Sequence, residues 1–370
     1  MENSVFITGS SLCCFLGNHP QHIIDNIKKL DVPDYEAHIK LFDDGYSYQL
    51  RGFSQSPTQK LYEVVEHVVK DAVKAAKLTP QMQEELSIFI GSTSMTIAAN
   101  EEKTHALGHA AIGDFVESIL ASKQGYYIFS TGCTSSANAL SYASRMIKQK
   151  KIKRAIVIGV ELANKSTRDG FESFMLLSES GVYRPFDQDS DGIMLGEGCS
   201  AVVLDSQRLT EGDFEYLGAA NLCDNHSETA SDVDGESIFS CMEQAIADAK
   251  LTVSDIDIIK CHATGSPNHN QAESAGLEKL LPSPADKHIA ICALKSFIGH
   301  TLGASGINEI VLLMLCINAG FIPRVAGFKA NHQLAFTPLQ NTLPIAQKVN
   351  VLFNYIGFSG NNTALVLSNR

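Results

Sequence analysis

The chain has 370 residues, of which 44% are hydrophobic and 19% are charged, the balance of an ordinary globular protein. Its net charge of −12, without any basic stripe, argues against nucleic acid and an anionic membrane as partners. No apolar run approaches the roughly 20 residues that span a bilayer, and the N-terminus lacks the basic segment of a signal peptide.

The cysteines and histidines indicate the compartment and argue against a metal site. Nine cysteines show no C-x-x-C pair and no framework spacing, so we expect reduced thiols in a cytoplasmic protein. The twelve histidines are scattered, with no H-E-x-x-H motif. We therefore expect no metal.

Short apolar runs that end in glycine or other small residues predict strands, most of them buried on both faces. In chain order they are Val5–Thr8, Ser87–Ile90, Tyr126–Phe129, Ala155–Ile158, Ile256–Ile259, Ile289–Ala293 and Val351–Tyr355. Apolar residues at helical spacing predict helices at Gln59–Ala76, Ser135–Lys148, Ile238–Ala249 and Ser305–Asn318. This alternation predicts an α/β fold.

Three sequence patterns occur twice, in the same order. A-K-L-T precedes a predicted strand at 76–79 and at 249–252, and "YYIFSTGC" at 126 is followed by the similar "IAICALKS" at 289. "SAVVLDS" at 200 likewise matches "TALVLSN" at 363. We interpret these pairs as two duplicated halves, residues 1–207 and 208–370. The functional site of such a protein is expected where strand ends of both halves meet.

Cys133 stands in a turn of small residues between a predicted strand and a predicted helix. The free N–H groups and the dipole of a helix N-terminus stabilise an anion, so we expect a lowered pKa and a favoured thiolate. Most free cysteines, however, are inert core residues. The local sequence alone leaves both interpretations open.

His262, Lys295 and His300 follow predicted strands of the second half. Each histidine alone is as compatible with a structural role as with a catalytic one. With a thiolate, two neutral imidazoles suit acyl transfer through a thioester, because they can hydrogen-bond the thioester oxygen while a malonyl donor loses CO₂. Lys295 would then orient a carboxylate or support a histidine.

Six segments, in order, resemble the β-ketoacyl synthases (ketosynthases) of the thiolase superfamily. They are "VFITGSSLCCFLG" from Val5, "STGCTSSANAL" from Ser130, "RPFDQDSDGIMLGEGCSAVVL" from Arg184, "CHATGSP" from Cys261, "KSFIGHTLGASGINE" from Lys295 and "NYIGFSGNNTALVL" from Asn354. The resemblance implies a five-layered α/β/α/β/α thiolase-like fold, which is itself a duplication and agrees with the repeated patterns.

The resemblance also implies roles for individual residues. Cys133 would be the acyl-accepting nucleophile, and His262 and His300 would promote decarboxylation and polarise the donor thioester. Lys295 and Glu309 would form a supporting charged pair.

Phe358 would be the gate residue of a glycine-rich loop, and the backbone N–H groups of Cys133 and Phe358 would form the oxyanion hole. The implied reaction condenses a Cys-bound acyl group with malonyl-[acyl carrier protein] and loses CO₂. It needs no metal and no organic cofactor. Fatty acid, polyketide and aryl-polyene biosynthesis all use it.

The implied partners are an acyl carrier protein and a second subunit, in a homodimer or in a heterodimer with a related chain. One alternative is a non-catalytic subunit that resembles a chain length factor, although such subunits usually lose the cysteine. Another is a thiolase that uses coenzyme A esters. Thiolases need a second catalytic cysteine near the C-terminus, and no cysteine follows Cys316.

The sequence departs from the family pattern at several positions. The family motif H-G-T-G-T is H-A-T-G-S, with Ala263 and Ser266, and Asn270 replaces an acidic residue. Ser359 replaces a glycine of the G-F-G-G loop. The acidic run at 187–192 resembles the start of a calcium-binding EF-hand loop but has Gly198 where that loop needs glutamate. We expect it to brace the site instead.

Overall fold

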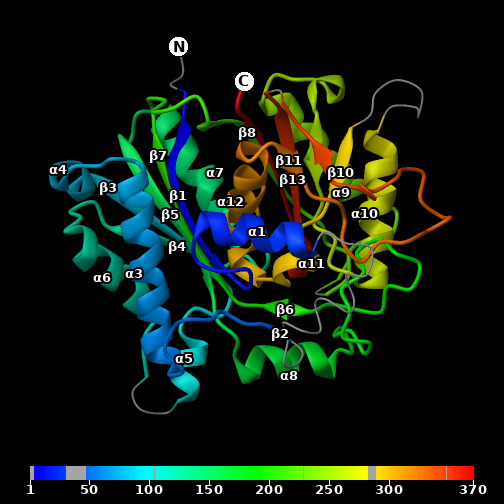
Figure 1. Ribbon diagram of the computed structural model, residues 1–370, viewed down its shortest axis with the longest axis horizontal. Helices are drawn as coiled ribbons and strands as arrows, with labels where there is room; N and C mark the ends of the chain where they lie inside the picture. Colours follow the sequence, from blue (N-terminus) through cyan, green and yellow to red (C-terminus); the bar gives the residue numbers. More distant parts are fainter. Residues whose placement is uncertain (1–3, 31–46, 103–105, 228, 282–288, 347) are drawn as a thin grey trace.

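The computed structural model describes residues 4–30, 47–102, 106–227, 229–281, 289–346 and 348–370. Ten strands form one mixed sheet in the order β10-β9-β13-β14-β8-β1-β7-β5-β3-β4 (Figure 1). They are β1 (Phe6–Cys14), β3 (Leu86–Gly91), β4 (Tyr126–Phe129), β5 (Arg154–Glu161), β7 (Gly198–Asp205), β8 (Phe214–Cys223), β9 (Ile258–Lys260), β10 (Ala290–Cys292), β13 (Asn350–Ile356) and β14 (Asn361–Ser368).

The first five and the last five of these strands follow the same plan. In both sets the spatial order is third, second, fourth, fifth and first. In both, the second strand is parallel to its two neighbours, and the remaining pairs are antiparallel. The two sets join through the short pairing of β1 with β8. This plan supports our proposal that the chain is a duplication with halves 1–207 and 208–370.

Helices cover the sheet in three layers. On the outside of the first half lie α3 (Pro57–Ala75) and α6 (Ala111–Leu120), and on the outside of the second lie α9 (Glu236–Asp248) and α10 (Pro267–Leu280). Between the halves lie α7 (Ser135–Lys148) and α12 (Ser305–Asn318), seen at the centre of Figure 1. The predicted order of five layers, α/β/α/β/α, is therefore confirmed.

The remaining elements are short or lie around these layers. They are the helices α1 (Pro20–Leu30), α4 (Pro80–Glu84), α5 (Ile97–Glu101), α8 (Lys165–Ser173) and α11 (Lys295–Ile298), the strands β2 (Ser47–Tyr48), β6 (Leu195–Gly196), β11 (Phe321–Ile322) and β12 (Leu343–Pro344), and the 3₁₀ turns η1 (Val253–Asp255), η2 (Leu302–Ala304) and η3 (Phe358–Gly360). No helix in the described ranges combines the length and the apolar character needed to cross a bilayer.

Alternating side chains of the strands explain the layers. On β5, Ala155 and Val157 enter the central core around α7 and α12, whereas Ile156 and Ile158 enter the outer core beneath α3. Successive residues of a strand point to opposite faces, so a strand that is apolar throughout is buried on both. All seven predicted strands and all four predicted helices are present, and α7 and α12 have the predicted bounds.

The strand β4 differs from the expectation of burial on both faces. It is the edge strand of the sheet, and the side chains of Tyr127 and Ile128 are 42% and 36% exposed. A short apolar run in this sequence can therefore form an exposed edge strand as well as a strand buried on both faces. Its exposed face extends onto α7, where Tyr142 is 51% exposed and lies against Phe129.

The two central helices cross at very short distance, which gives the first testable prediction. A Cβ atom on Gly306 of α12 would lie 2.3 Å from the backbone nitrogen of Ala137 on α7. We expect Gly306→Ala to lower the free energy of unfolding by about 1–3 kcal/mol, because two packed backbones have to separate. Denaturant unfolding of the purified variant measures the change.

Gly170→Ala is the matched control. Gly170 is also helical, on α8, but a Cβ atom there would meet nothing within 4 Å. Alanine is the better helix former, so this control should unfold at the same or a slightly higher denaturant concentration. Equal stability of Gly306→Ala and the wild type would show that α7 and α12 are not held this close.

Candidate active site

One thiol and two imidazoles meet in the interior of the molecule. The distance from Cys133 Sγ to His300 Nε2 is 3.1 Å, and the rings of His262 and His300 are perpendicular with centroids 5.3 Å apart. All three side chains are buried. The sequence analysis named these residues from segments far apart in the chain, and the structure brings them together.

Strand ends and tight turns hold the three residues. Cys133 lies between β4 and the first turn of α7, and His262 lies two residues after the end of β9. His300 lies between α11 and η2, where its backbone N–H donates to Met194 O at 2.7 Å and its carbonyl accepts from Gly196 N at 3.0 Å. Both halves of the molecule thus contribute to the cluster.

The pKa of the Cys133 thiol is not lowered, and that expectation was wrong. Burial raises the pKa of Cys133 to about 12, against the opposing effects of Lys295 and of the Phe358 backbone N–H. The helix N-terminus cannot outweigh the removal of a thiolate from water. The thiol is therefore neutral in the resting site and needs a base to remove its proton.

His300 is placed to be that base. Burial, followed by the charge of Lys295, holds the pKa of His300 well below its usual value, so the ring is neutral. Its Nδ1 lies 3.2 Å from Ser305 Oγ. A hydroxyl both donates and accepts, so Ser305 can serve either tautomer of the ring. Nε2 is then free to accept the thiol proton or to carry one.

The other imidazole is fixed by a lysine. Lys295 Nζ lies 3.3 Å from His262 Nδ1 and donates to His262 O at 2.6 Å and to Glu309 Oε1 at 2.6 Å. An ammonium has no acceptor, so His262 Nδ1 must accept and Nε2 carries the proton. Burial first, then Lys295, lowers the pKa of His262 well below its usual value.

Phe358 lies beside the thiol at the other end of the site. Its backbone N–H points to Cys133 Sγ, and its ring stacks on Phe171 with centroids 5.4 Å apart. Gly132, with φ +61°, brings the two loops together, since a Cβ there would lie 3.5 Å from Phe358 O. The arrangement fits a pair of N–H donors next to the sulfur.

Two departures from the family pattern fall on left-handed backbone. Ala263 has φ 47° and Ser359 has φ 59°, a region that favours glycine. Asn270 has a bracing role, because it donates to Ser190 Oγ at 3.0 Å while Ser190 donates to Gly265 O at 2.7 Å. With these residues in place, the centroid of the His262 ring lies 5.3 Å from that of His300.

The carboxylates of the acidic run at 187–192 accept from neighbouring loops, and their role in bracing the site stays a prediction. Asp187 accepts from the backbone of Lys329 at 2.7 Å and of Ala330 at 3.0 Å. Asp191 accepts from Ser178 Oγ at 2.7 Å and from Ser180 N at 2.8 Å. Protein donors thus already contact the carboxylates of Asp187 and Asp191, two of the acidic residues in this run.

Sequence analysis missed three buried polar residues that support the cluster. Glu273 on α10 accepts from His262 N at 2.6 Å and Ala263 N at 2.7 Å. Glu161 accepts from Gly303 N at 3.0 Å, and Ser305 lies beside His300. Burial raises the pKa of both carboxyl groups. Glu161 ends β5 and Ser305 begins α12, so their places at element ends could have indicated them, whereas Glu273 lies in the middle of α10.

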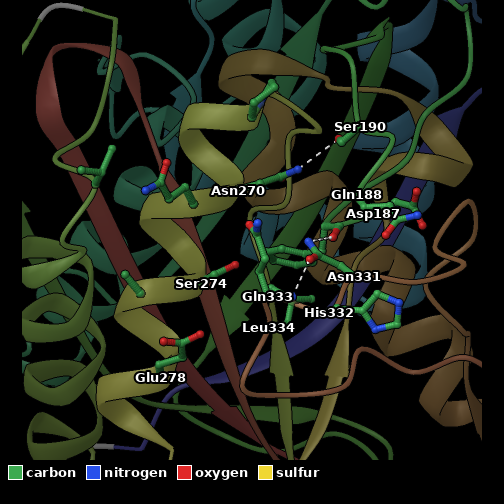
Figure 2. A pocket seen from close by; sticks show the side chains of 15 residues that line it. Asp187, Gln188, Ser190, Asn270, Ser274, Glu278, Asn331, His332, Gln333 and Leu334 are labelled. Carbon is green, nitrogen blue, oxygen red and sulfur yellow. Dashed lines mark hydrogen bonds between the residues drawn. The ribbon is translucent and has the colours of Figure 1, made fainter.

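A cavity of about 750 Å³ lies beside α10 (Figure 2). Asn270 and Ser274 of α10 face it, together with Asp187 and Asn331. None of the residues that line it belongs to the thiol and imidazole cluster. The cavity and the thiol and imidazole cluster are therefore separate features of the molecule.

The cluster also has the composition of a metal site. Within the described ranges it is the one group of three such residues whose ligand atoms, in Cys133, His262 and His300, lie within 4.8 Å of one another. Sulfur and imidazole nitrogen are ligands that zinc accepts. A metal ion would be coordinated by the same sulfur and nitrogen atoms that thiol chemistry uses, so metal binding and thiol chemistry exclude each other here.

Comparison with known proteins assigns the family. The profile of the β-ketoacyl synthase N-terminal domain matches residues 49–209, and that of the C-terminal domain matches residues 214–329. The chain belongs to the β-ketoacyl synthase family. Members of this family are condensing acyltransferases, so the protein is an enzyme of that class by family.

Curated relatives of the synthase come from two kinds of protein. Over 99% of this chain and 87% of the relative, it is 26% identical to a chloroplastic 3-oxoacyl-[acyl-carrier-protein] synthase I of Arabidopsis thaliana. Over 76% of this chain it is 30% identical to a polyketide synthase of Dictyostelium discoideum, of which it covers 13%. The synthase thus matches nearly all of one relative and a small part of the other.

Solved structures share the whole fold. A ketosynthase complex with a type II polyketide acyl-carrier protein superimposes with a TM-score of 0.85 at 19% identity, with full coverage of both chains. A complex of a ketosynthase with its chain length factor from Xenorhabdus doucetiae gives 0.79 at 21% identity, covering 99% and 98%. The predicted thiolase-like fold is confirmed.

Proposed function

We propose that this synthase is a β-ketoacyl-[acyl carrier protein] synthase that condenses an acyl group on Cys133 with malonyl-[acyl carrier protein]. The observation that carries the proposal is the 3.1 Å contact between the Cys133 thiol and His300, with His262 in the same buried cluster. Nucleophile, base and second imidazole are all retained at the distances that acyl transfer needs.

The first half-reaction loads the enzyme. Cys133 gives its proton to His300 Nε2, and the sulfur attacks the carbonyl carbon of the acyl carrier thioester. The backbone N–H groups of Cys133 and Phe358 stabilise the oxyanion that forms. The carrier thiolate leaves and takes the proton back from His300, so the balance is one thioester exchanged for another.

The second half-reaction makes the carbon–carbon bond. His262 Nε2–H and His300 Nε2–H donate to the carbonyl oxygen of the malonyl thioester, and the malonyl carboxylate leaves as CO₂. The resulting enolate carbon attacks the acyl–Cys133 thioester. The sulfur departs, one proton is taken up, and 3-oxoacyl carrier protein is the product. Lys295 and Glu309 hold His262 during this step.

The proposal requires partners. The carrier proteins supply both substrates, as the solved relative with an acyl-carrier protein illustrates for that complex. A second subunit, identical or related, fits the open edge of β4, because an unpaired strand edge with exposed Tyr127, Ile128 and Tyr142 is suited to pairing with another chain. We propose that the dimer forms through this edge.

We place the pathway among the type II polyketide or aryl-polyene systems, with fatty acid synthesis as the other family use. The departures at Ala263, Asn270 and Ser359 support a specialised substrate. A cytoplasmic location is supported by nine cysteines that are all free thiols.

A second candidate function is a non-catalytic subunit that shapes the pocket of a ketosynthase partner. The likeness to a ketosynthase complex that contains a chain length factor favours it. The two candidates differ in which chain carries the acyl group. They also differ in whether this chain condenses substrates by itself.

The deciding experiment incubates the purified synthase with acyl and malonyl carrier proteins, alone and with a co-purified partner chain. We expect 3-oxoacyl carrier protein by mass spectrometry, and an acyl adduct on this chain. If only the partner carries the adduct, the non-catalytic candidate holds and the proposed one fails.

A further inference from the structure

Lys260 is a lysine without exposed surface near the centre of the molecule. It ends β9, two residues before His262, and its ammonium donates to Glu309 Oε2 at 2.6 Å and to Asn354 O at 3.0 Å. The same nitrogen lies 3.6 Å from the centroid of the Tyr355 ring. Lysines are almost never fully buried unless such partners compensate for the lost water.

Glu309 connects this lysine to the histidine pair. One carboxylate oxygen accepts from Lys260 and the other accepts from Lys295, each at 2.6 Å. Lys295 in turn contacts His262 at both Nδ1 and the backbone carbonyl. Four buried residues therefore form one continuous chain of polar contacts, which starts on β9 and returns to the loop after it.

The order of contacts determines the proton on His262. All the contacts of Lys295 point to Glu309 and His262, so a small displacement of Lys295 would release the ring. His262 would then be able to place its proton on Nδ1 and lose the Nε2–H. On its other oxygen, Glu309 accepts from Lys260.

Two buried lysines, Lys260 and Lys295, share the carboxylate of Glu309 close to His262. Burial lowers the pKa of Lys260 to about 8, against the opposing charge of Glu309, so the ammonium form prevails at neutral pH. Burial lowers the pKa of His262, and the charges of Lys295 and Lys260 lower it further. The two ammonium groups thus favour the neutral form of the His262 imidazole. In that form, with Nδ1 accepting, His262 can donate its Nε2–H.

We propose that Lys260 is a positioning residue for the decarboxylation step: it anchors Glu309, Glu309 anchors Lys295, and Lys295 holds His262 as an Nε2–H donor. The inference rests on the proposed condensing function, because it assigns a role within that reaction. A Lys260–Glu309 ion pair with a purely structural role in the core would make the same contacts. The test therefore needs a readout beyond stability.

Lys260→Met removes the charge and keeps the length of the side chain. We expect kcat for CO₂ release from malonyl carrier protein to fall about 10–100-fold, as for other residues that orient a reacting group. KM should stay nearly unchanged and the acyl adduct on Cys133 should still form, since neither depends on His262 Nε2–H. Circular dichroism and thermal unfolding report whether the variant is folded.

Lys148→Met is the matched control. The Lys148 ammonium also donates to a backbone carbonyl, Leu217 O at 2.7 Å, and lies 4.9 Å from the centroid of the Tyr216 ring. It is the last residue of α7, whereas Cys133 precedes the first turn of that helix. Lys148→Met should keep the wild-type kcat. It would then show that removing the charge of a partly buried lysine is not enough to slow CO₂ release, and that the effect is particular to Lys260.

Chemical rescue separates charge from shape. Lys260→Ala leaves space for n-propylammonium, which has the missing atoms and the charge, whereas 1-propanol has a similar shape without charge. We expect propylammonium, and not propanol, to restore kcat. If Lys260→Met fails to fold, Lys260→Gln provides a neutral polar side chain for the same measurement.

Folded Lys260 variants that release CO₂ at the wild-type rate would overturn the inference, as would equal rescue by propanol. The wild-type enzyme serves as the internal reference for the proposed function. If the wild type loads acyl groups and releases CO₂ but the variants match it, only the role of Lys260 fails. If the wild type does neither, the proposed function fails and the role of Lys260 falls with it.

Discussion

Cys133→Ala is expected to remove the acyl adduct completely and to stop formation of 3-oxoacyl carrier protein. The variant lacks the sulfur that lies 3.1 Å from His300 Nε2, and among the described residues no other cysteine forms a group of three with the two imidazoles. Alanine cannot form a thioester, so the loss does not depend on how well the loops adapt. Intact-mass spectrometry after incubation with acyl carrier protein measures the adduct.

Cys133→Ala should still release CO₂ from malonyl carrier protein. The imidazole rings of His262 and His300, and the contacts of Lys295, do not depend on the sulfur. Decarboxylation without condensation would therefore separate the two half-reactions. It would also show that the variant is folded around the site, which a simple loss of activity cannot do.

Two other cysteines provide controls. Cys241 on α9 is buried like Cys133, and its thiol donates to Ala220 O at 3.5 Å. Cys223 is exposed, so a carrier thioester could acylate it non-specifically, without a binding site. Cys241→Ala and Cys223→Ala should both keep the adduct. An adduct that persists in Cys133→Ala and disappears in Cys223→Ala would refute the assignment of the nucleophile.

The sequence predicted the central layers well because their residues obey one simple rule. The apolar positions of α7 and α12 recur at helical spacing, and strands such as β5 are apolar throughout. By contrast, β8 and α10 were not predicted. In α10 the buried face includes His269, Asn270 and Glu273, so the hydrophobic period disappears where polar side chains are buried to support a site.

The members of the thiol and imidazole cluster and the Lys295–Glu309 pair were predictable, but Lys260 was not. Cys133, His262 and His300 follow strands within segments that resemble a known family, so their order along the chain was enough. Lys260 differs, because a lone lysine in a sequence usually belongs to the surface. Only tertiary packing reveals that Lys260 and Glu309 lie within 2.6 Å of each other.

The pKa of Cys133 could not be predicted from its local sequence either. A turn before a helix favours an anion through N–H groups and the dipole. Burial opposes it and raises the pKa, and so does the nearby charge of Glu161, which is distant in sequence. The correction changes the mechanism, because a neutral thiol makes His300 a necessary base.

His300→Ala is expected to slow CO₂ release from malonyl carrier protein by at least about 100-fold, the usual effect of removing one donor from an oxyanion or enolate. His300 Nε2 lies next to the sulfur, where the malonyl thioester oxygen has to be in order to place the enolate carbon near the acyl group. Acyl loading should slow as well, because the pKa of Cys133 is about 12 and the base is gone. Quenched time courses measure the two rates separately, one following CO₂ release and the other following formation of the acyl adduct.

His300→Gln separates the two roles of the ring. A glutamine amide can donate an N–H near the position of Nε2, but it cannot take a proton from the thiol. We expect this variant to keep more of the decarboxylation than His300→Ala and to load acyl groups as slowly. His67→Ala removes a half-buried imidazole on α3, outside the cluster, and should change neither rate. Undiminished CO₂ release in folded His300→Ala would take His300 out of the decarboxylation step, and His262 would then be the one imidazole left to stabilise the enolate.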